Sequence, residues 1–161
     1  MKPKPEDITF HYTKPEMVKD LIAMIPFQIR DSVLDAGSGR NKVWYNFIPG
    51  YCVKDKCEIE EGVDFLTLKR QYEWIIGNPP FHIGYKFILK ASELSLEGFA
   101  FLLNTQGLNS LTPIRISKIQ GNGFYLQKIH IVNDKRWFGR YYFVIFQKKP
   151  NDFLSYTLQA Y

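Results

Sequence analysis

The sequence has no long apolar segment. None of its apolar runs approaches the roughly 20 residues that a helix needs to cross a bilayer, and residues 1–5 lack the apolar core of a signal peptide. It also has no internal repeat, low-complexity tract or linker-like run of glycine, serine and proline. These absences predict a cytoplasmic protein with one domain over residues 1–161, in which residues 1–12 form an N-terminal arm.

Cysteine and histidine are scarce. The two cysteines, Cys52 and Cys57, have no second pair, and the three histidines are scattered along the chain. A structural zinc site needs four ligands at a characteristic spacing, which these residues do not provide. We therefore expect no metal site and two free thiols that are buried or half-buried.

Acidic residues are scarce near the C-terminus, where basic and aromatic residues are interleaved. Residues 124–149 contain six basic residues and one acid, although the net charge of the whole chain is only +5. Cations neutralise phosphates and flat rings stack on unpaired bases, so this pattern fits a nucleic-acid surface. A strand pair with a solvated basic face is an equally simple interpretation. The residues concerned are Lys128, Lys135, Arg136, Trp137, Phe138, Arg140, Tyr141, Tyr142, Lys148 and Lys149.

Apolar periodicity predicts strands that alternate with helices. Thr13 and Glu16 have the spacing of a capping box at the start of the first helix. The alternation closes on two adjacent strands, which predicts an α/β fold with a mostly parallel sheet and an antiparallel C-terminal hairpin. Ligands of such sheets bind outside the carboxyl ends of the strands. The predicted helices span 14–25, 43–48 and 85–94, and the predicted strands span 32–35, 51–59, 73–77, 99–103, 126–132 and 141–146.

A glycine loop follows the first predicted strand. Asp35 ends that strand and Ala36-Gly37-Ser38-Gly39 follows, where glycine lets the backbone turn sharply and lie against a ligand. No Gly-Lys-Ser or Gly-Lys-Thr comes next, so this is not a phosphate-binding P-loop. Asn41 stands near the place of the third glycine of a dinucleotide fingerprint. An acid before the loop favours a ligand with an ammonium group, and the alternative is an ordinary strand-to-helix turn.

Glu58 ends the next predicted strand, about 20 residues beyond the glycine loop. Nucleotide-binding α/β folds place a carboxylate there to accept hydrogen bonds from the ribose hydroxyls. Glu60 and Glu61 compete for this role, and a surface position explains any of the three. We favour Glu58 because Ile59 beside it could then lie against an adenine ring.

The tetrapeptide Asn78-Pro79-Pro80-Phe81 is the most specific motif in the sequence. A residue before proline is confined to extended conformations, so the carbonyl groups of Asn78 and Pro79 point in fixed directions. The side-chain oxygen of Asn78 and the backbone oxygen of Pro79 can therefore accept both hydrogens of one amino group. This shifts a planar amine toward a tetrahedral nitrogen that attacks a methyl sulfonium. Phe81 would then stack on a flipped base.

The order of these motifs resembles that of the class I Rossmann-like amino-methyltransferases, which use S-adenosylmethionine, and especially the N6-adenine DNA methyltransferases. The resemblance covers most of the chain. It is carried by Thr13-Lys14-Pro15, Asp35-Ala36-Gly37-Ser38-Gly39, Glu58-Ile59, Asp64-Phe65 and Asn78-Pro79-Pro80-Phe81. It implies a single three-layer domain with a seven-stranded, mostly parallel sheet and a last strand inserted antiparallel.

The resemblance also implies a role for each motif. Thr13 would line the cofactor site, residues 35–39 would bind the methionine part of S-adenosylmethionine, and Glu58 would bind the ribose. Asp64 and Phe65 would hold the cofactor adenine, and Asn78 with the three residues after it would form the catalytic loop beside the cofactor.

Two departures from the family concern size. Only 43 positions separate Asp35 from Asn78, so the third strand and its helices must be short or missing. No separate target-recognition domain is expected. The late segment that resembles the base-contacting motif of the family must then bind the substrate, through Lys135, Arg136, Trp137, Phe138 and Arg140.

Four functions remain open from the sequence. We rank first the methylation of adenine N6 in DNA, and second the methylation of adenine or guanine amino groups in RNA. Glutamine methylation in a protein ranks third, because the basic and aromatic segment would have no use there. A binding subunit without catalysis ranks last, because Asn78 to Phe81 is intact.

Overall fold

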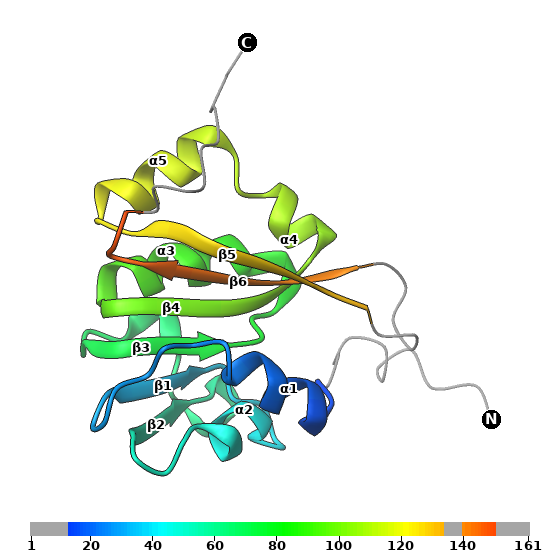
Figure 1. The fold of residues 1–161 in the computed structure, drawn as a ribbon, viewed down its shortest axis with the longest axis vertical. Helices are drawn as coiled ribbons and strands as arrows, with labels where there is room; N and C mark the ends of the chain where they lie inside the picture. The colour runs from blue at the N-terminus through cyan, green and yellow to red at the C-terminus, as the bar shows by residue number, and fades with distance from the viewer. Residues whose placement is uncertain (1–12, 134–139, 151–161) are drawn as a thin grey trace, which may run out of the picture.

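A mixed six-stranded β-sheet forms the centre of the part of the chain that the structure describes (Figure 1). The structure is a computed structural model, and it describes residues 13–133 and 140–150. The strand order is β2-β1-β3-β4-β6-β5. The strands are β1 (Ser32–Ala36), β2 (Val53–Cys57), β3 (Tyr72–Gly77), β4 (Ser95–Asn104), β5 (Tyr125–Val132) and β6 (Tyr141–Gln147).

The first four strands run parallel, and β6 runs against them. β6 pairs antiparallel with β4 on one side and with β5 on the other, so the last strand is inserted between two strands of the opposite direction. This confirms the mostly parallel sheet and the insertion of the last strand. β1 and β3 are buried on both faces, with Leu34 and Ile75 no more than 1% exposed, which explains their continuous apolar sequences.

Helices cover both faces of the sheet and make three layers. α1 (Pro15–Ile22) and α2 (Val43–Phe47) contribute to a core on one face, and α3 (Gly84–Leu94) and α5 (Pro113–Gly121) contribute to a core on the other. A short helix, α4 (Thr105–Asn109), follows the carboxyl end of β4. No helix among the described residues is long and apolar enough to cross a bilayer.

The prediction of seven strands is wrong for the described residues. Residues 58–71, between β2 and β3, form two 3₁₀ helices, η2 (Ile59–Glu61) and η3 (Phe65–Thr67), in place of a further strand and its helices. A further strand here would need a crossover on each side of it, each of a dozen residues or more, and residues 58–71 are too few for both. β2 consequently becomes an outer strand of the sheet.

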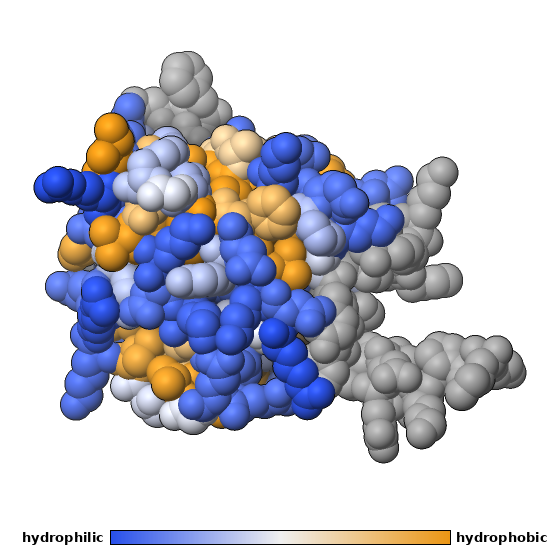
Figure 2. All heavy atoms as spheres, turned by 90° about the horizontal axis from the view of Figure 1, so that it is seen from below, coloured by the Kyte–Doolittle hydropathy of each residue, from blue (hydrophilic) through white to orange (hydrophobic). Residues whose placement is uncertain are grey.

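Figure 2 shows the side of the molecule beyond β2, which lies lowest in Figure 1. Hydrophilic side chains predominate on this side, with separate apolar areas between them. The exposed apolar residues of β2 and the turn before it are Tyr51 and Val53. Cys52 and Cys57 are buried and free, as the sequence predicts.

Candidate active site

A cavity of about 330 Å³ opens beside the carboxyl ends of β1, β2 and β3. Its volume lies within the range of sites that bind small molecules and cofactors. Four separate stretches of the chain meet there, and they include most of the residues selected from the sequence. The selected residues that line the cavity are Thr13, Gly37, Ser38, Gly39, Glu58, Ile59, Asp64, Phe65, Asn78, Pro79, Pro80 and Phe81.

The glycine loop is tied to the end of β2 by its own backbone. The N–H groups of Gly37 and Ser38 both donate to the Cys57 carbonyl oxygen, each at 3.0 Å, and Gly39 N–H donates to Glu58 Oε2 at 2.7 Å. Gly37 has a φ of +73°, in the left-handed region that residues with a side chain rarely adopt. The loop is therefore held open against the cavity by hydrogen bonds that do not depend on a ligand.

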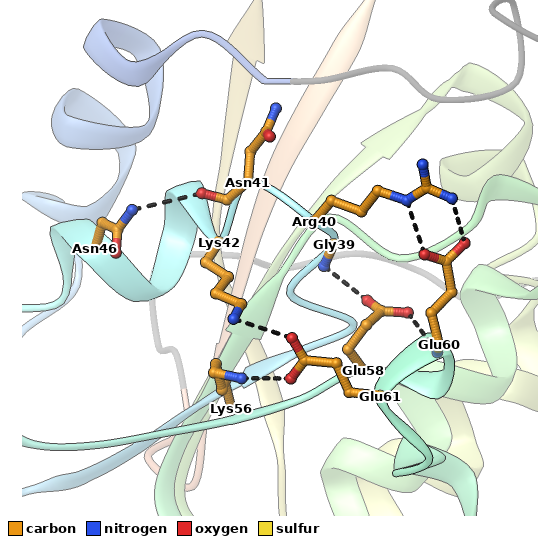
Figure 3. A network of polar contacts seen from close by, with 9 residues as sticks. All are labelled: Gly39, Arg40, Asn41, Lys42, Asn46, Lys56, Glu58, Glu60 and Glu61. Carbon is orange, nitrogen blue, oxygen red and sulfur yellow. Dashed lines mark hydrogen bonds and ion pairs between the residues drawn. The ribbon is translucent and has the colours of Figure 1, made fainter.

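Glu58 is the carboxylate that faces both the glycine loop and the cavity (Figure 3). Its second oxygen accepts a hydrogen bond from Glu60 N–H at 3.3 Å. Two backbone donors therefore orient the side chain, and each oxygen keeps a second lone pair for another donor. This arrangement suits a carboxylate that binds a pair of hydroxyl groups.

The two competing acids belong to surface ion pairs. Glu60 pairs with Arg40, at 2.9 Å between Oε2 and Nε. Glu61 pairs with Lys42 at 3.0 Å and with Lys56 at 2.5 Å. These pairs link the glycine loop to the turn after β2 (Figure 3). Glu60 also lines the cavity, but its carboxylate is engaged by Arg40.

An apolar wall stands beyond Glu58. Phe65 is buried and packs on Phe87 with ring centroids 4.8 Å apart, and both rings line the cavity. Ile59 is 68% exposed at the rim. Asp64 accepts a hydrogen bond from Leu66 N–H at 2.9 Å, which caps η3 and leaves its other oxygen available. An apolar wall beside a carboxylate oxygen suits a flat heterocycle with one polar edge.

The catalytic-loop candidate leaves the end of β3 through Gly77. A Cβ at this position would lie 2.7 Å from the Ala36 carbonyl oxygen, so only glycine lets the two loops approach this closely. Asn78 follows, and its side-chain nitrogen donates to Thr13 Oγ1 at 3.2 Å. That bond orients the amide, because it directs the nitrogen toward Thr13 and the oxygen away from it.

Thr13 does not cap the first helix, so the capping-box prediction is wrong. The N-cap of α1 is Lys14, and no side chain caps it. Thr13 is instead buried and bonded to Asn78, 65 positions away. The Thr13 hydroxyl therefore supports the motif that follows β3.

The rest of the tetrapeptide forms one side of the cavity. Pro79 is buried, Pro80 is exposed, and the Phe81 ring packs on Tyr141 with centroids 5.7 Å apart. Tyr141 begins β6, so the C-terminal hairpin reaches the catalytic-loop candidate. This contact places two aromatic rings beside the two prolines.

Asp35 and Ala36 are not among the residues that line the cavity. The Asp35 carboxylate is buried, accepts a hydrogen bond from Tyr45 N–H at 2.9 Å, and has one oxygen without a partner among the described residues. Burial raises its pKa from 3.8 to about 7, although the bond from Tyr45 opposes that change. Asp35 thus holds α2 against the glycine loop, and its predicted contact with the methionine part of a cofactor stays a prediction.

Two buried polar groups in the cavity wall have no hydrogen-bond partner among the described residues. They are the Ser38 hydroxyl and the Trp44 indole N–H. A buried polar group without a partner costs about 1–3 kcal/mol, and a polar ligand in the cavity removes that cost. Sequence reasoning missed Trp44, although its place directly after the glycine loop was a signal.

Of the predicted substrate-binding residues, only Arg140 is described. It is exposed, and its carbonyl oxygen accepts a hydrogen bond from Thr105 Oγ1 at 3.3 Å. Lys135, Arg136, Trp137 and Phe138 lie outside the described residues. The strand ends on either side of them, Val132 and Tyr141, pair with each other.

Parallel strands, an inserted antiparallel last strand and a cavity at the carboxyl ends define the Rossmann-like methyltransferase fold. No protein-family model and no curated protein matches the sequence. Among the described residues, no three histidine, cysteine or acidic side chains form a group that could hold a metal ion.

Three solved structures illustrate the similarity in fold. Magnesium protoporphyrin IX methyltransferase from Synechocystis PCC 6803, with bound SAH, is 12% identical with a TM-score of 0.64, and the match covers 92% of this chain and 89% of that one. A dimethyladenosine transferase from Plasmodium falciparum is 12% identical with a TM-score of 0.63, over 86% and 62% of the two chains. The E. cuniculi Mtq2-Trm112 complex, responsible for methylation of the termination factor eRF1, is 12% identical with a TM-score of 0.61, over 86% and 98%.

Proposed function

We propose that this protein transfers the methyl group of S-adenosylmethionine to the exocyclic N6 amine of an adenine in a nucleic acid, with DNA as the first candidate. One observation carries the proposal. The loop Asn78 to Phe81 lines the same cavity as the glycine loop and Glu58, so the motif proposed to bind an amine adjoins the motif proposed to bind the cofactor. The solved structure of the same fold with bound SAH supports the choice of cofactor.

The residues of the cavity fit S-adenosylmethionine. Ser38 and Trp44, whose buried donors have no partner in the described part of the chain, would donate to the carboxylate of the methionine part beside the glycine loop. Glu58 would accept the ribose hydroxyls, and Phe65 would pack on the adenine, whose polar edge would face Asp64. When bound, the cofactor supplies an electrophilic methyl group on a positively charged sulfur.

The catalytic loop would prepare the amine. The Asn78 amide oxygen and the Pro79 carbonyl oxygen would accept its two hydrogens, which would direct the nitrogen lone pair out of the ring plane. As the nitrogen takes the methyl group, the bond from that group to sulfur would break, and one of the two hydrogens would leave as a proton to solvent. Thr13 keeps the Asn78 amide in that orientation through its 3.2 Å bond. Phe81, supported by Tyr141, would stack on the flipped base.

RNA is the second candidate substrate. The 23S rRNA methyltransferase ErmE, which is 12% identical with a TM-score of 0.60, has the same fold. Protein glutamine ranks third. One structure of the same fold belongs to a complex that methylates a protein, but the basic and aromatic residues around Trp137 would have no use in that reaction.

Methyl transfer from labelled S-adenosylmethionine to DNA, RNA and protein, assayed in parallel, tests the proposal. Identification of N6-methyladenine in digested DNA or RNA is the expected result, and the polymer that carries it decides between the first two candidates. Asn78→Ala serves as the matched control, since it should retain cofactor binding without transfer. Label in protein alone would overturn the proposal.

A further inference from the structure

The short helix α4 lies beside the catalytic-loop candidate. It contacts the turn Phe81–Ile83 that follows the two prolines. Thr105, its first residue, donates a hydrogen bond to the carbonyl oxygen of Arg140, and the next residue, Tyr141, packs on Phe81. Figure 1 shows α4 at the same end of the sheet as the end of β5 and the start of β6. Any base that stacked on Phe81 would have neighbours close to this helix.

α4 is held rigidly despite its five residues. Asn104 caps its start by accepting from Gly107 N–H at 2.8 Å, and the Ser110 hydroxyl donates to the Gly107 carbonyl oxygen at 2.7 Å. Arg115 then fixes the end of the helix by donating to the Ser110 carbonyl oxygen at 2.9 Å, while its guanidinium lies over the Tyr85 ring at 4.1 Å. Side chains on such a fixed element can discriminate between ligands, because their positions are set in advance.

Two exposed side-chain amides project from this helix. Gln106 and Asn109 are three positions apart, which places them on neighbouring sites of one helical face. No hydrogen bond of either amide occurs within the described part of the chain. Asparagine and glutamine amides read base edges, most often adenine, through paired hydrogen bonds. These amides are therefore available to a ligand at the edge of the active site.

The charge around α4 suits a polyanion. No acidic residue occurs over 74–92, which includes the catalytic loop, or over 98–133, which includes α4 and α5. Six of the sixteen acids lie instead within 55–73, and three of these, Glu58, Glu60 and Asp64, line the cavity. Three further side chains lie beside α4. Arg115 and the exposed Arg140 are cationic, and the exposed His82 carries no negative charge. Phosphates that approach the catalytic loop from this side meet no repulsive carboxylate from these two stretches.

We propose that α4 contacts the nucleotides next to the target base, and that Gln106 and Asn109 determine which bases are preferred there. This inference rests on the proposed function, because it requires a nucleic-acid substrate. It adds a recognition element to a site whose chemistry does not depend on it.

Methylation of an oligonucleotide pool with randomised positions around one adenine tests this inference. The pool is made of the polymer that the wild-type protein methylates, and methylated products are sequenced. We expect a base preference at one or two neighbouring positions, which Gln106→Ala or Asn109→Ala reduces by about five- to a hundredfold. Affinity for S-adenosylmethionine should stay unchanged in both variants. Gln71→Ala, an exposed amide next to the start of β3, is the matched control and should keep the wild-type preference.

Two results would overturn the inference and leave the proposed function intact. One is a wild-type protein that methylates adenine without any preference at neighbouring positions. The other is a preference that survives in both Gln106→Ala and Asn109→Ala. Absence of methylation in every nucleic acid would instead contradict the proposed function itself, and the inference with it.

Discussion

The buried carboxylate of Asp35 should make the stability of this protein fall between pH 4 and pH 7. In the fold, burial raises the pKa of Asp35 to about 7, whereas the ordinary value is 3.8. Both states hold the proton below pH 3.8, and both have lost it above pH 7. Between these values the unfolded chain binds fewer protons than the folded one, so the free energy of unfolding decreases as the pH rises.

The size of this effect follows from the difference in pKa. Each pKa unit corresponds to about 1.4 kcal/mol, so the charge on Asp35 costs the folded state on the order of 4 kcal/mol at pH 8. Asp35→Asn removes the charge and keeps a side-chain oxygen that can accept the bond from Tyr45 N–H. We expect the free energy of unfolding of Asp35→Asn, relative to that of the wild type, to increase by a few kcal/mol as the pH rises from 4 to 8.

Urea unfolding of both proteins across this pH range, followed by tryptophan fluorescence, measures the difference. Other titrating groups are common to the two proteins and cancel. Glu60→Gln is a control of opposite sign: the hydrogen bond from Arg40 lowers the pKa of Glu60 from 4.5, so the stability of this variant should fall relative to wild type only as the pH rises toward 4.5, and the difference should then stay constant up to pH 8. If the difference in free energy of unfolding between Asp35→Asn and the wild type stays constant from pH 4 to pH 8, the reasoning is refuted.

Three further predictions concern function. Glu58→Gln should weaken S-adenosylmethionine binding by about 1–3 kcal/mol, since a charge-assisted bond to the ribose becomes a neutral one, and unchanged affinity in calorimetry would remove Glu58 from that role. Asn78→Ala should lose at least about a hundredfold in turnover while its cofactor affinity is kept, and turnover at the wild-type rate would contradict the mechanism. Replacement of Lys135, Arg136 and Arg140 together by glutamine should make the slope of log affinity for an oligonucleotide against log salt concentration shallower by up to about three, if each residue neutralises a phosphate. An unchanged slope would place the nucleic acid elsewhere.

Motifs that act through the backbone were readable from the sequence. Glycines that let a chain turn and prolines that fix a carbonyl direction mark their own positions, which is why the loops after β1 and β3 were found. The central strands were equally clear, because strands buried on both faces leave continuous apolar runs. The structure brings both loops to one cavity, as strands with a common direction require.

Contacts between distant residues were not readable. Thr13 has the spacing of a helix cap, yet its hydroxyl bonds Asn78, and no local pattern distinguishes the two roles. Asp35 precedes the glycine loop as a ligand-binding acid would, but its carboxylate turns toward Tyr45. Phe87 lies in a predicted helix, and only the packing of α3 on η3 shows that its ring lines the cavity.

Two elements were missed for different reasons. α4 has five residues, too few for a periodic pattern to be recognised. α5 carried readable signals, since Pro113 begins it and its buried isoleucines are three positions apart. The prediction of a seventh strand came from the family resemblance alone. The apolar pattern of the sequence itself predicted six strands.

Among the described residues, β2 is an outer strand of the sheet with an open edge. An open outer strand offers its backbone to the same strand of a second molecule. In β2 the three middle residues are Lys54, Asp55 and Lys56, and ion pairs with Arg70 and Glu61 hold two of these charges on the molecule's own surface. Charge on such an edge makes a second strand costly to add. The charges on β2 thus protect this edge electrostatically, without a covering strand among the described residues.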